Sequence, residues 1–213
     1  MEKELQKRIL SSLIIIPFSL FFIIKGSAFF ILFLIILFSI ACSEWLKMTR
    51  KIENKVFGIF FLLSSFFAVY LIRDKNLLEF LLILIICITT DIGGYVFGKI
   101  FKGPKLIKIS PNKTYSGALG GFLLSLIVTY LIMEKYDNYF IENRNFLEDM
   151  HFIFIVFLVS GVSQIGDLII SYFKRSSRIK NTGNLFPGHG GLLDRVDGMI
   201  FAFPFVYVIS KIL

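Results

Sequence analysis

Residues 160–198 decide the fold, and they read SGVSQIGDLIISYFKRSSRIKNTGNLFPGHGGLLDRVDG. Polar side chains recur at three- and four-residue spacing in the otherwise apolar first half, which places them on one face of a helix. A polar stripe on an apolar helix faces a bundle interior or a watery cavity, because charged groups are costly in lipid. The stretch predicts a polar site inside a membrane helix bundle. The stripe contains Ser160, Gln164, Asp167, Ser171, Lys174 and Arg178.

The second half of the stretch adds a glycine-rich loop and two more carboxylates. Asp194 and Asp197 are three residues apart, so one helical turn presents both together. Carboxylates from two helices suit Mg²⁺, which takes oxygen ligands and keeps substrate phosphates in its shell. The residues alone leave an internal ion pair open, for example between Asp167 and Lys174. We interpret five residues as the candidate catalytic set: Asp167, Lys174, Arg175, Asp194 and Asp197.

The composition is that of an integral membrane protein. The 213 residues are 56% apolar without counting glycine, whereas soluble domains reach about 45–50% with glycine included. The formal net charge of +8 favours anionic lipid headgroups, and no basic tail or basic–aromatic interleaving indicates nucleic acid. Cys42 and Cys87 lie in apolar runs, where we interpret them as small core residues.

Seven apolar stretches approach or reach the length of about 17–25 residues that a membrane span needs. The prediction is an all-α, polytopic membrane helix bundle, with N-terminal helices in residues 1–75 and a catalytic bundle in 76–213. A cleaved signal peptide is disfavoured because a second span follows the first at once, after a tight hairpin at Lys25 and Gly26. Glu44, near the end of the second span, is interpreted as an interfacial residue. The seven stretches are 9–24, 28–46, 56–72, 77–97, 117–133, 152–173 and 192–212.

The distribution of Lys and Arg predicts the orientation of the bundle. With a cytoplasmic N-terminus, seventeen of these residues fall in inside segments and six in outside segments. The inside of a membrane protein carries the excess of Lys and Arg. The loops at 99–116 and 174–195 are therefore predicted to be cytoplasmic, where nucleotides are.

Three motifs resemble one enzyme family, that of phosphatidate cytidylyltransferase, also called CDP-diglyceride synthase. The strongest comprises residues 171–175, Lys180 and residues 187–197. Residues 90–99 are similar to the family's Thr-Asp-x-x-Ala-Tyr-x-x-Gly segment, and residues 110–117 to its Ser-Pro-x-Lys-Thr-Trp-Glu-Gly segment. The resemblance covers about residues 88–200, and the first 75 residues match only in being hydrophobic. The chain departs from the family pattern at Tyr115, Ser116 and Asn181.

The residues alone leave two of these segments open. Asp91 could lie at the water interface of a packing face made by Gly94 and Gly98, which are spaced for close helix approach. Residues 109–121 could form an ordinary turn that caps the next helix. The resemblance implies that both segments belong to the site, with Asp167 and Asp194 as metal ligands. The implied substrate- and nucleotide-binding residues are Asp91, Ser110, Lys113, Thr114, Ser171, Lys180, His189, Gly190, Gly191 and Arg195.

The resemblance implies a reaction of CTP with phosphatidate that gives CDP-diacylglycerol and pyrophosphate. It also implies Mg²⁺ as cofactor, with a second cation left open, a homodimer, and a place in the bacterial cytoplasmic (inner) membrane. Two alternatives stand beside it: a CTP-dependent lipid kinase, and a non-catalytic membrane protein of the same fold.

Overall fold

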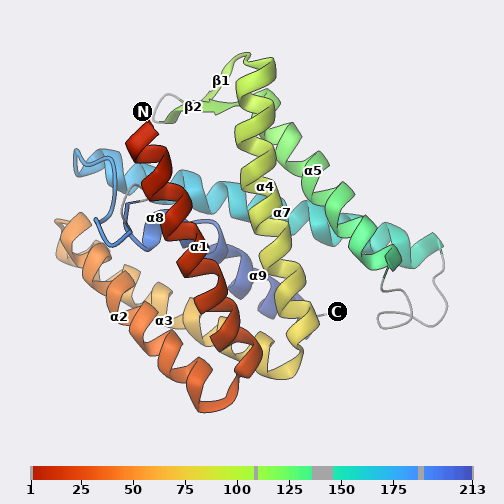
Figure 1. Ribbon diagram of the computed structural model, residues 1–213, viewed down its shortest axis with the longest axis horizontal. Coiled ribbons are helices and arrows are strands. Elements are labelled where there is room, and N and C mark those ends of the chain that lie inside the picture. Colours follow the sequence, from red (N-terminus) through yellow and green to blue (C-terminus); the bar gives the residue numbers. More distant parts are fainter. Residues whose placement is uncertain (1, 108–109, 136–145, 187–189, 213) are drawn as a thin grey trace.

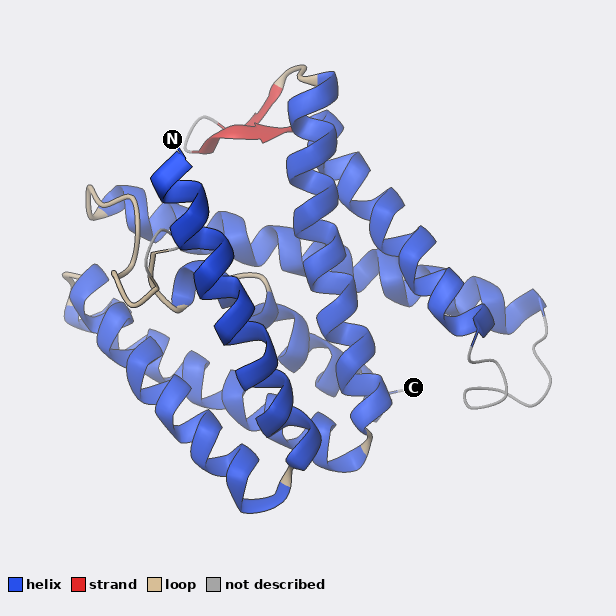
Figure 2. Ribbon diagram, viewed as in Figure 1, coloured by secondary structure: helices blue, strands red, loops and turns tan. Residues whose placement is uncertain are grey.

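The computed structural model describes residues 2–107, 110–135, 146–186 and 190–212, and helices make up most of it (Figures 1 and 2). The all-α prediction is confirmed, with one small addition. Residues predicted as a loop after the fourth span contain a two-stranded antiparallel hairpin. The elements are α1 (Glu2–Lys25), α2 (Ser27–Met48), α3 (Ile52–Lys75), α4 (Leu77–Phe101), β1 (Lys105–Ile107), β2 (Ser110–Thr114), α5 (Tyr115–Lys135), α7 (Phe146–Ser176), α8 (Leu193–Val196) and α9 (Met199–Ile212).

Helices occupy all seven stretches that were predicted to span the membrane. Within the described residues, α2, α3, α4, α5 and the Phe152–Ser176 part of α7 are long and apolar enough to cross a bilayer. The first and last stretches form shorter apolar helices, Leu13–Lys25 and Met199–Lys211. Large apolar side chains such as Phe57, Phe60 and Leu119 are exposed on the outside of the bundle, as lipid-facing residues are.

The predicted tight hairpin between the first two helices is confirmed. Gly26 joins α1 to α2 with a φ of 66°, a conformation that glycine adopts without steric cost. Arg73 of α3 donates from Nε to the carbonyl of Ile23 at 2.9 Å and from Nη2 to that of Ile24 at 3.1 Å. These bonds satisfy carbonyls that the end of a helix leaves without partners.

Helices α4 and α5 form the most extensive helix pair, and glycines allow them to approach closely. A Cβ atom on Gly117 would come within 2.6 Å of the carbonyl oxygen of Gly94 and 3.3 Å of the Cα of Gly98. The packing role predicted for Gly94 and Gly98 is therefore confirmed. The pair carries the β1–β2 hairpin at its end (Figure 1).

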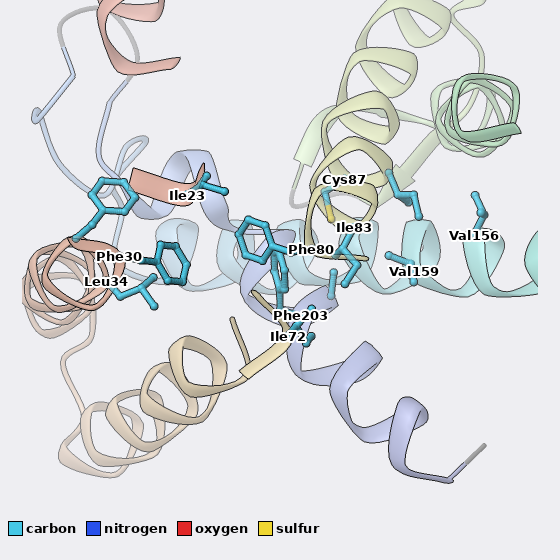
Figure 3. Packing of buried hydrophobic residues seen from close by; sticks show 13 residues of the cluster. Ile23, Phe30, Leu34, Ile72, Phe80, Ile83, Cys87, Val156, Val159 and Phe203 are labelled. Atoms are coloured by element: carbon cyan, nitrogen blue, oxygen red, sulfur yellow. The ribbon is translucent and has the colours of Figure 1, made fainter. Parts of the chain in front are cut away.

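Among the described residues, two clusters of buried apolar side chains pack the helices against one another. In the larger one, Phe80 of α4 packs between Phe30 of α2 and Phe203 of α9, with ring centroids 5.9 and 5.0 Å apart (Figure 3). The second cluster includes apolar residues of the 160–198 stretch itself, and it holds α8 in place because Leu193 of α8 is one of its buried members. Its buried members are Ala41, Trp45, Met48, Leu62, Ile170, Leu192, Leu193 and Ile200.

Replacing Gly117 by Ala should destabilise the bundle, although Ala favours a helix over Gly by about 1 kcal/mol. The added methyl group must displace the α4 backbone, and overpacking of this kind costs about 1–3 kcal/mol. A lowered thermal midpoint in detergent would show it. Gly161→Ala is the matched control, because its Cβ would meet the Phe122 ring at an ordinary 3.7 Å. Equal midpoints for the two variants would contradict the packing argument.

Candidate active site

The polar stripe of α7 faces the inside of the bundle, as its spacing predicted. Ser160 is fully buried and accepts a 2.8 Å hydrogen bond from the hydroxyl of Thr90 on α4. Ser171 donates to Asp167 Oδ1 at 3.3 Å. Lys174 is 8% exposed, so its ammonium group requires buried partners. The prediction that Arg178 continues the stripe is wrong, because α7 ends at Ser176 and Arg178 is an exposed residue beyond it with a φ of 59°.

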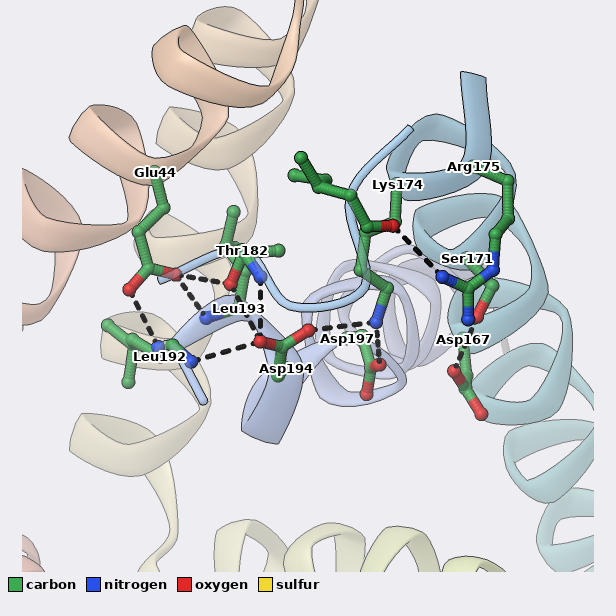
Figure 4. Close-up of polar contacts among 12 residues, drawn as sticks. Glu44, Asp167, Ser171, Lys174, Arg175, Thr182, Leu192, Leu193, Asp194 and Asp197 are labelled. Atoms are coloured by element: carbon green, nitrogen blue, oxygen red, sulfur yellow. Dashed lines mark hydrogen bonds and ion pairs between the residues drawn. The ribbon is translucent and has the colours of Figure 1, made fainter. Parts of the chain in front are cut away.

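Lys174 joins α7 to both carboxylates of the next helical turn. Its Nζ donates to Asp194 Oδ1 at 2.8 Å and lies 3.9 Å from Asp197 Oδ2 (Figure 4). The prediction that one turn presents both carboxylates together is confirmed. The ion pair that the residues left open between Asp167 and Lys174 is not the one formed, because Asp167 pairs with Lys113 instead.

Asp194 also ties two parts of the loop to the start of α8. Its Oδ2 accepts from the Thr182 N–H at 2.8 Å, the Gly191 N–H at 2.9 Å and the Thr182 hydroxyl at 3.1 Å. Burial acts to raise the pKa of Asp194, but the bonds from Lys174, Gly191 and Thr182 outweigh it and lower the pKa below its ordinary value. Asp194 is therefore held as a carboxylate.

Asp197 lies beside Asp167 of α7, and Asp91 of α4, which is exposed, acts on Asp197 through its charge. Burial and then the charge of Asp167 raise the pKa of Asp197 well above its ordinary value, while Lys174 opposes the rise. The charge of Asp91 on α4 acts in the same direction as that of Asp167. A like charge beside a buried carboxyl group disfavours its ionised form.

The β1–β2 hairpin brings a second ammonium group to these carboxylates. Lys113 on β2 forms its ion pair with Asp167, and both side chains are about three-quarters buried, at 26% exposed. Thr114 accepts a 3.1 Å bond from the Gly117 N–H and so caps α5. The capping interpretation of this segment is confirmed, and its role in phosphate binding stays a prediction. Ser116, where the family pattern has Glu, donates to the Lys102 carbonyl.

Two other predicted site residues, Arg175 and Lys180, are not directed at the carboxylates. Arg175 donates to the Ile179 carbonyl at 2.9 Å beyond the end of α7, and Lys180 is exposed in the following turn. Arg195 lies within electrostatic reach of Asp91. His189 and the side chain of Ser110 lie outside the described residues.

Gly190 and Gly191 were predicted to contact nucleotide, and both use their N–H groups within the chain. Gly190 donates to the Phe186 carbonyl at 3.1 Å and has a φ of 90°, a conformation that favours glycine. Gly191 donates to Asp194, as described above. Their role in nucleotide binding stays a prediction.

Glu44 was interpreted as an interfacial residue, and this is wrong. Its side chain is 5% exposed and its carboxylate accepts hydrogen bonds from the loop that carries Asp194. The signal was present in the sequence, because an acidic residue in an apolar span is costly unless it has partners. Those partners lie more than 130 residues away, so spacing along the chain could not identify them.

The acidic residues fit a hard divalent cation in their chemistry. Such an ion takes oxygen ligands, needs only one or two carboxylates, and completes its shell with water and substrate phosphates. Among the residues described, no three Asp, Glu, His or Cys side chains are arranged as a complete metal site. Two ammonium groups, from Lys113 and Lys174, supply positive charge at these carboxylates. The arrangement suits a cation that arrives with a phosphate.

Replacing Lys174 by Met should strongly destabilise the protein. Removing one partner of a buried ion pair costs about 3–5 kcal/mol, because the remaining charge is left uncompensated. Here Asp194 and Asp197 would both lose the ammonium group that compensates their charge. Thermal unfolding in detergent measures the change. Lys47→Met on the exposed end of α2 is the control, and a Lys174 variant that unfolds like this control would refute the buried pairing.

The comparisons with known proteins show which family the chain resembles. The cytidylyltransferase family model matches residues 56–213. A phosphatidate cytidylyltransferase of Rickettsia conorii is 34% identical, covering 91% of this chain and 85% of that protein. One of Rickettsia bellii is 33% identical, with 98% and 92% covered. One of Staphylococcus saprophyticus is 36% identical, with 68% and 54% covered.

The comparisons also change one expectation from the sequence. The match to the Rickettsia bellii protein covers nearly the whole chain, so the likeness is not confined to residues 88–200. The family resemblance itself is confirmed. With a family model matching residues 56–213 and relatives matching over most of their own length, the chain belongs to the cytidylyltransferase family.

Proposed function

We propose that this chain joins CTP to phosphatidate and releases CDP-diacylglycerol and pyrophosphate. The observation that carries the proposal is the pairing of inward-facing carboxylates with two ammonium groups: Asp167 pairs with Lys113, and Asp194 and Asp197 pair with Lys174. The relatives named above, which match over most of the chain, are called phosphatidate cytidylyltransferases. No comparison favours the lipid kinase or the non-catalytic alternative.

The reaction joins two polyanions, and the residues of the site address their repulsion. The phosphate oxygen of phosphatidate is already an anion, so it attacks the α-phosphorus of CTP without a strong general base. The ammonium groups of Lys113 and Lys174 are placed to neutralise phosphate charge. Holding the two phosphates in line supplies much of the remaining rate enhancement.

Magnesium binding at these carboxylates is part of the proposal. Asp167 is the central ligand, and its predicted partner is Asp194. The contacts favour Asp197 as the nearer partner, because Asp194 already accepts from the N–H groups of Thr182 and Gly191 and from Lys174, whereas Asp197 lies beside Asp167. When bound there, Mg²⁺ supplies positive charge to the phosphates of both substrates.

The place of the site suits a lipid and a soluble nucleotide. Figure 1 shows the start of α1, the end of α2, the β1–β2 hairpin and the end of α7 on one side of the bundle. These are the segments rich in Lys and Arg, which the positive-inside bias assigns to the cytoplasm. We place the protein in the bacterial cytoplasmic membrane, where CTP reaches the site from water and the acyl chains stay in the bilayer. A homodimer is part of this proposal.

Separate labelling of CTP tests the reaction directly. The purified protein is given phosphatidate, Mg²⁺, and CTP labelled at either the α- or the γ-phosphate. We expect lipid to acquire the α label only, with the γ label released in pyrophosphate. Transfer of the γ label to lipid would instead establish a kinase, and the absence of both labels from lipid would overturn the proposal.

A further inference from the structure

Glu44 of α2 holds the turn that precedes α8. Its Oε1 accepts from the Leu192 N–H at 2.8 Å, and its Oε2 accepts from the Leu193 N–H at 2.9 Å. The Thr182 hydroxyl lies 2.7 Å from the same Oε2. Three donors therefore meet one buried carboxylate, and they come from two loop segments that are ten residues apart.

The backbone around Glu44 leaves room for the carboxylate and for little else. A Cβ on Gly191 would come within 2.6 Å of both Glu44 oxygens, and one on Gly183 within 2.7 Å of Oε1. Side chains at these two positions would displace the carboxylate. Gly183 and Gly191 thus allow Glu44 to contact the backbone directly. Packing against Glu44 therefore explains these glycines, in addition to the nucleotide-binding role that the family resemblance implies for Gly191.

The contacts continue from Glu44 to the carboxylates of the site (Figure 4). The hydroxyl of Thr182 lies between Glu44 Oε2 and Asp194 Oδ2, at 2.7 and 3.1 Å. Asp194 bonds to Lys174, and Lys174 pairs with Asp197. Moving the Leu192 and Leu193 backbone would move the helical turn on which Asp194 and Asp197 lie.

We propose that Glu44 is a positioning residue for the reaction, an inference that rests on the function proposed above. It touches no reacting group, and it acts by fixing the turn that presents Asp194 and Asp197 to Lys174. Glu44 lies before residue 56, where the match to the family model begins. The N-terminal helices are then part of the catalytic apparatus, because they supply the anchor for its most buried turn.

The Glu44→Gln variant tests this role with little change of shape. Gln offers one acceptor oxygen in place of two and turns its amide N–H₂ toward backbone N–H groups. We expect kcat to fall by about tenfold or more, since small misplacements of catalytic groups are costly in rate. We expect KM for CTP to stay within about twofold, because the loss is confined to the transition state. Amide hydrogen exchange in residues 190–196 should rise about tenfold or more as the turn opens more often.

Ser65→Ala is the matched control for a merely structural effect. Ser65 of α3 is fully buried and donates to the Ile200 carbonyl at 2.7 Å, so it also ties an N-terminal helix to the C-terminal part of the chain. Its other hydrogen-bond partner is the Phe61 carbonyl of its own helix. Neither partner belongs to the 182–193 turn, whose residues Thr182, Leu192 and Leu193 contact Glu44. We expect this variant to lower the thermal midpoint while kcat and exchange in residues 190–196 stay near wild type. Equal losses of kcat in both variants at equal midpoints would overturn the positioning role.

Two further measurements keep the outcome clear. If Glu44→Gln does not fold, Thr182→Val removes the hydroxyl between the two carboxylates and leaves the backbone bonds to Glu44 in place. It should shift kcat and exchange in the same direction, and unchanged values would refute the proposal. Hydrogen exchange needs no substrate, so it tests the role of Glu44 separately from the reaction. A wild-type protein without cytidylyltransferase activity would refute the proposed function. Unchanged exchange in Glu44→Gln would refute the inference about Glu44.

Discussion

The buried ammonium group of Lys174 is the interaction on which the site depends. A charge removed from water is costly, and its attraction to a counter-charge compensates only when geometry and further hydrogen bonds are good. Lys174 meets this condition because Asp194 of α8 and Asp197, which directly follows α8, place carboxylates at 2.8 and 3.9 Å from it. The start of α8 must therefore be fixed, and Glu44, Thr182 and the buried Leu192 and Leu193 side chains fix it.

This requirement connects the two halves of the chain. The N-terminal helices bury Trp45 and Met48 against the leucines of α8 and place Glu44 on its backbone. The close pair of α4 and α5 carries the hairpin that brings Lys113 to Asp167. Apolar helices thus position a small group of charges inside the bundle, which the proposed reaction would use to bring a lipid phosphate and a nucleotide together. Apolar side chains are exposed on the outside of the bundle, and polar partners surround this group of charges on the inside.

Local patterns predicted the parts of the structure that depend on neighbours in sequence. The spacing of Ser160, Asp167 and Lys174 placed them on one helix face, and the spacing of Asp194 and Asp197 placed both carboxylates on one helical turn. The seven apolar stretches located the helices. The pairings of Glu44 with the 182–193 turn and of Lys113 with Asp167 join residues 54 or more positions apart. No periodicity encodes such contacts, because tertiary packing alone decides which helix ends meet. The hairpin at 105–114 was missed for a related reason, since its short strands carry no alternating apolar pattern.

The central claim is that carboxylates from neighbouring elements hold a divalent cation that also binds the phosphates of the nucleotide. Crystals grown with Mn²⁺ and CTP would test it most directly, because Mn²⁺ replaces Mg²⁺ at oxygen ligands and is located by its anomalous scattering. The account predicts an anomalous peak in contact with Asp167 and a phosphate oxygen, with Asp197 beside it and Lys113 moved from Asp167 to the nucleotide. A peak remote from Asp167 and Asp197, with the Lys113–Asp167 pair still in place, would contradict it.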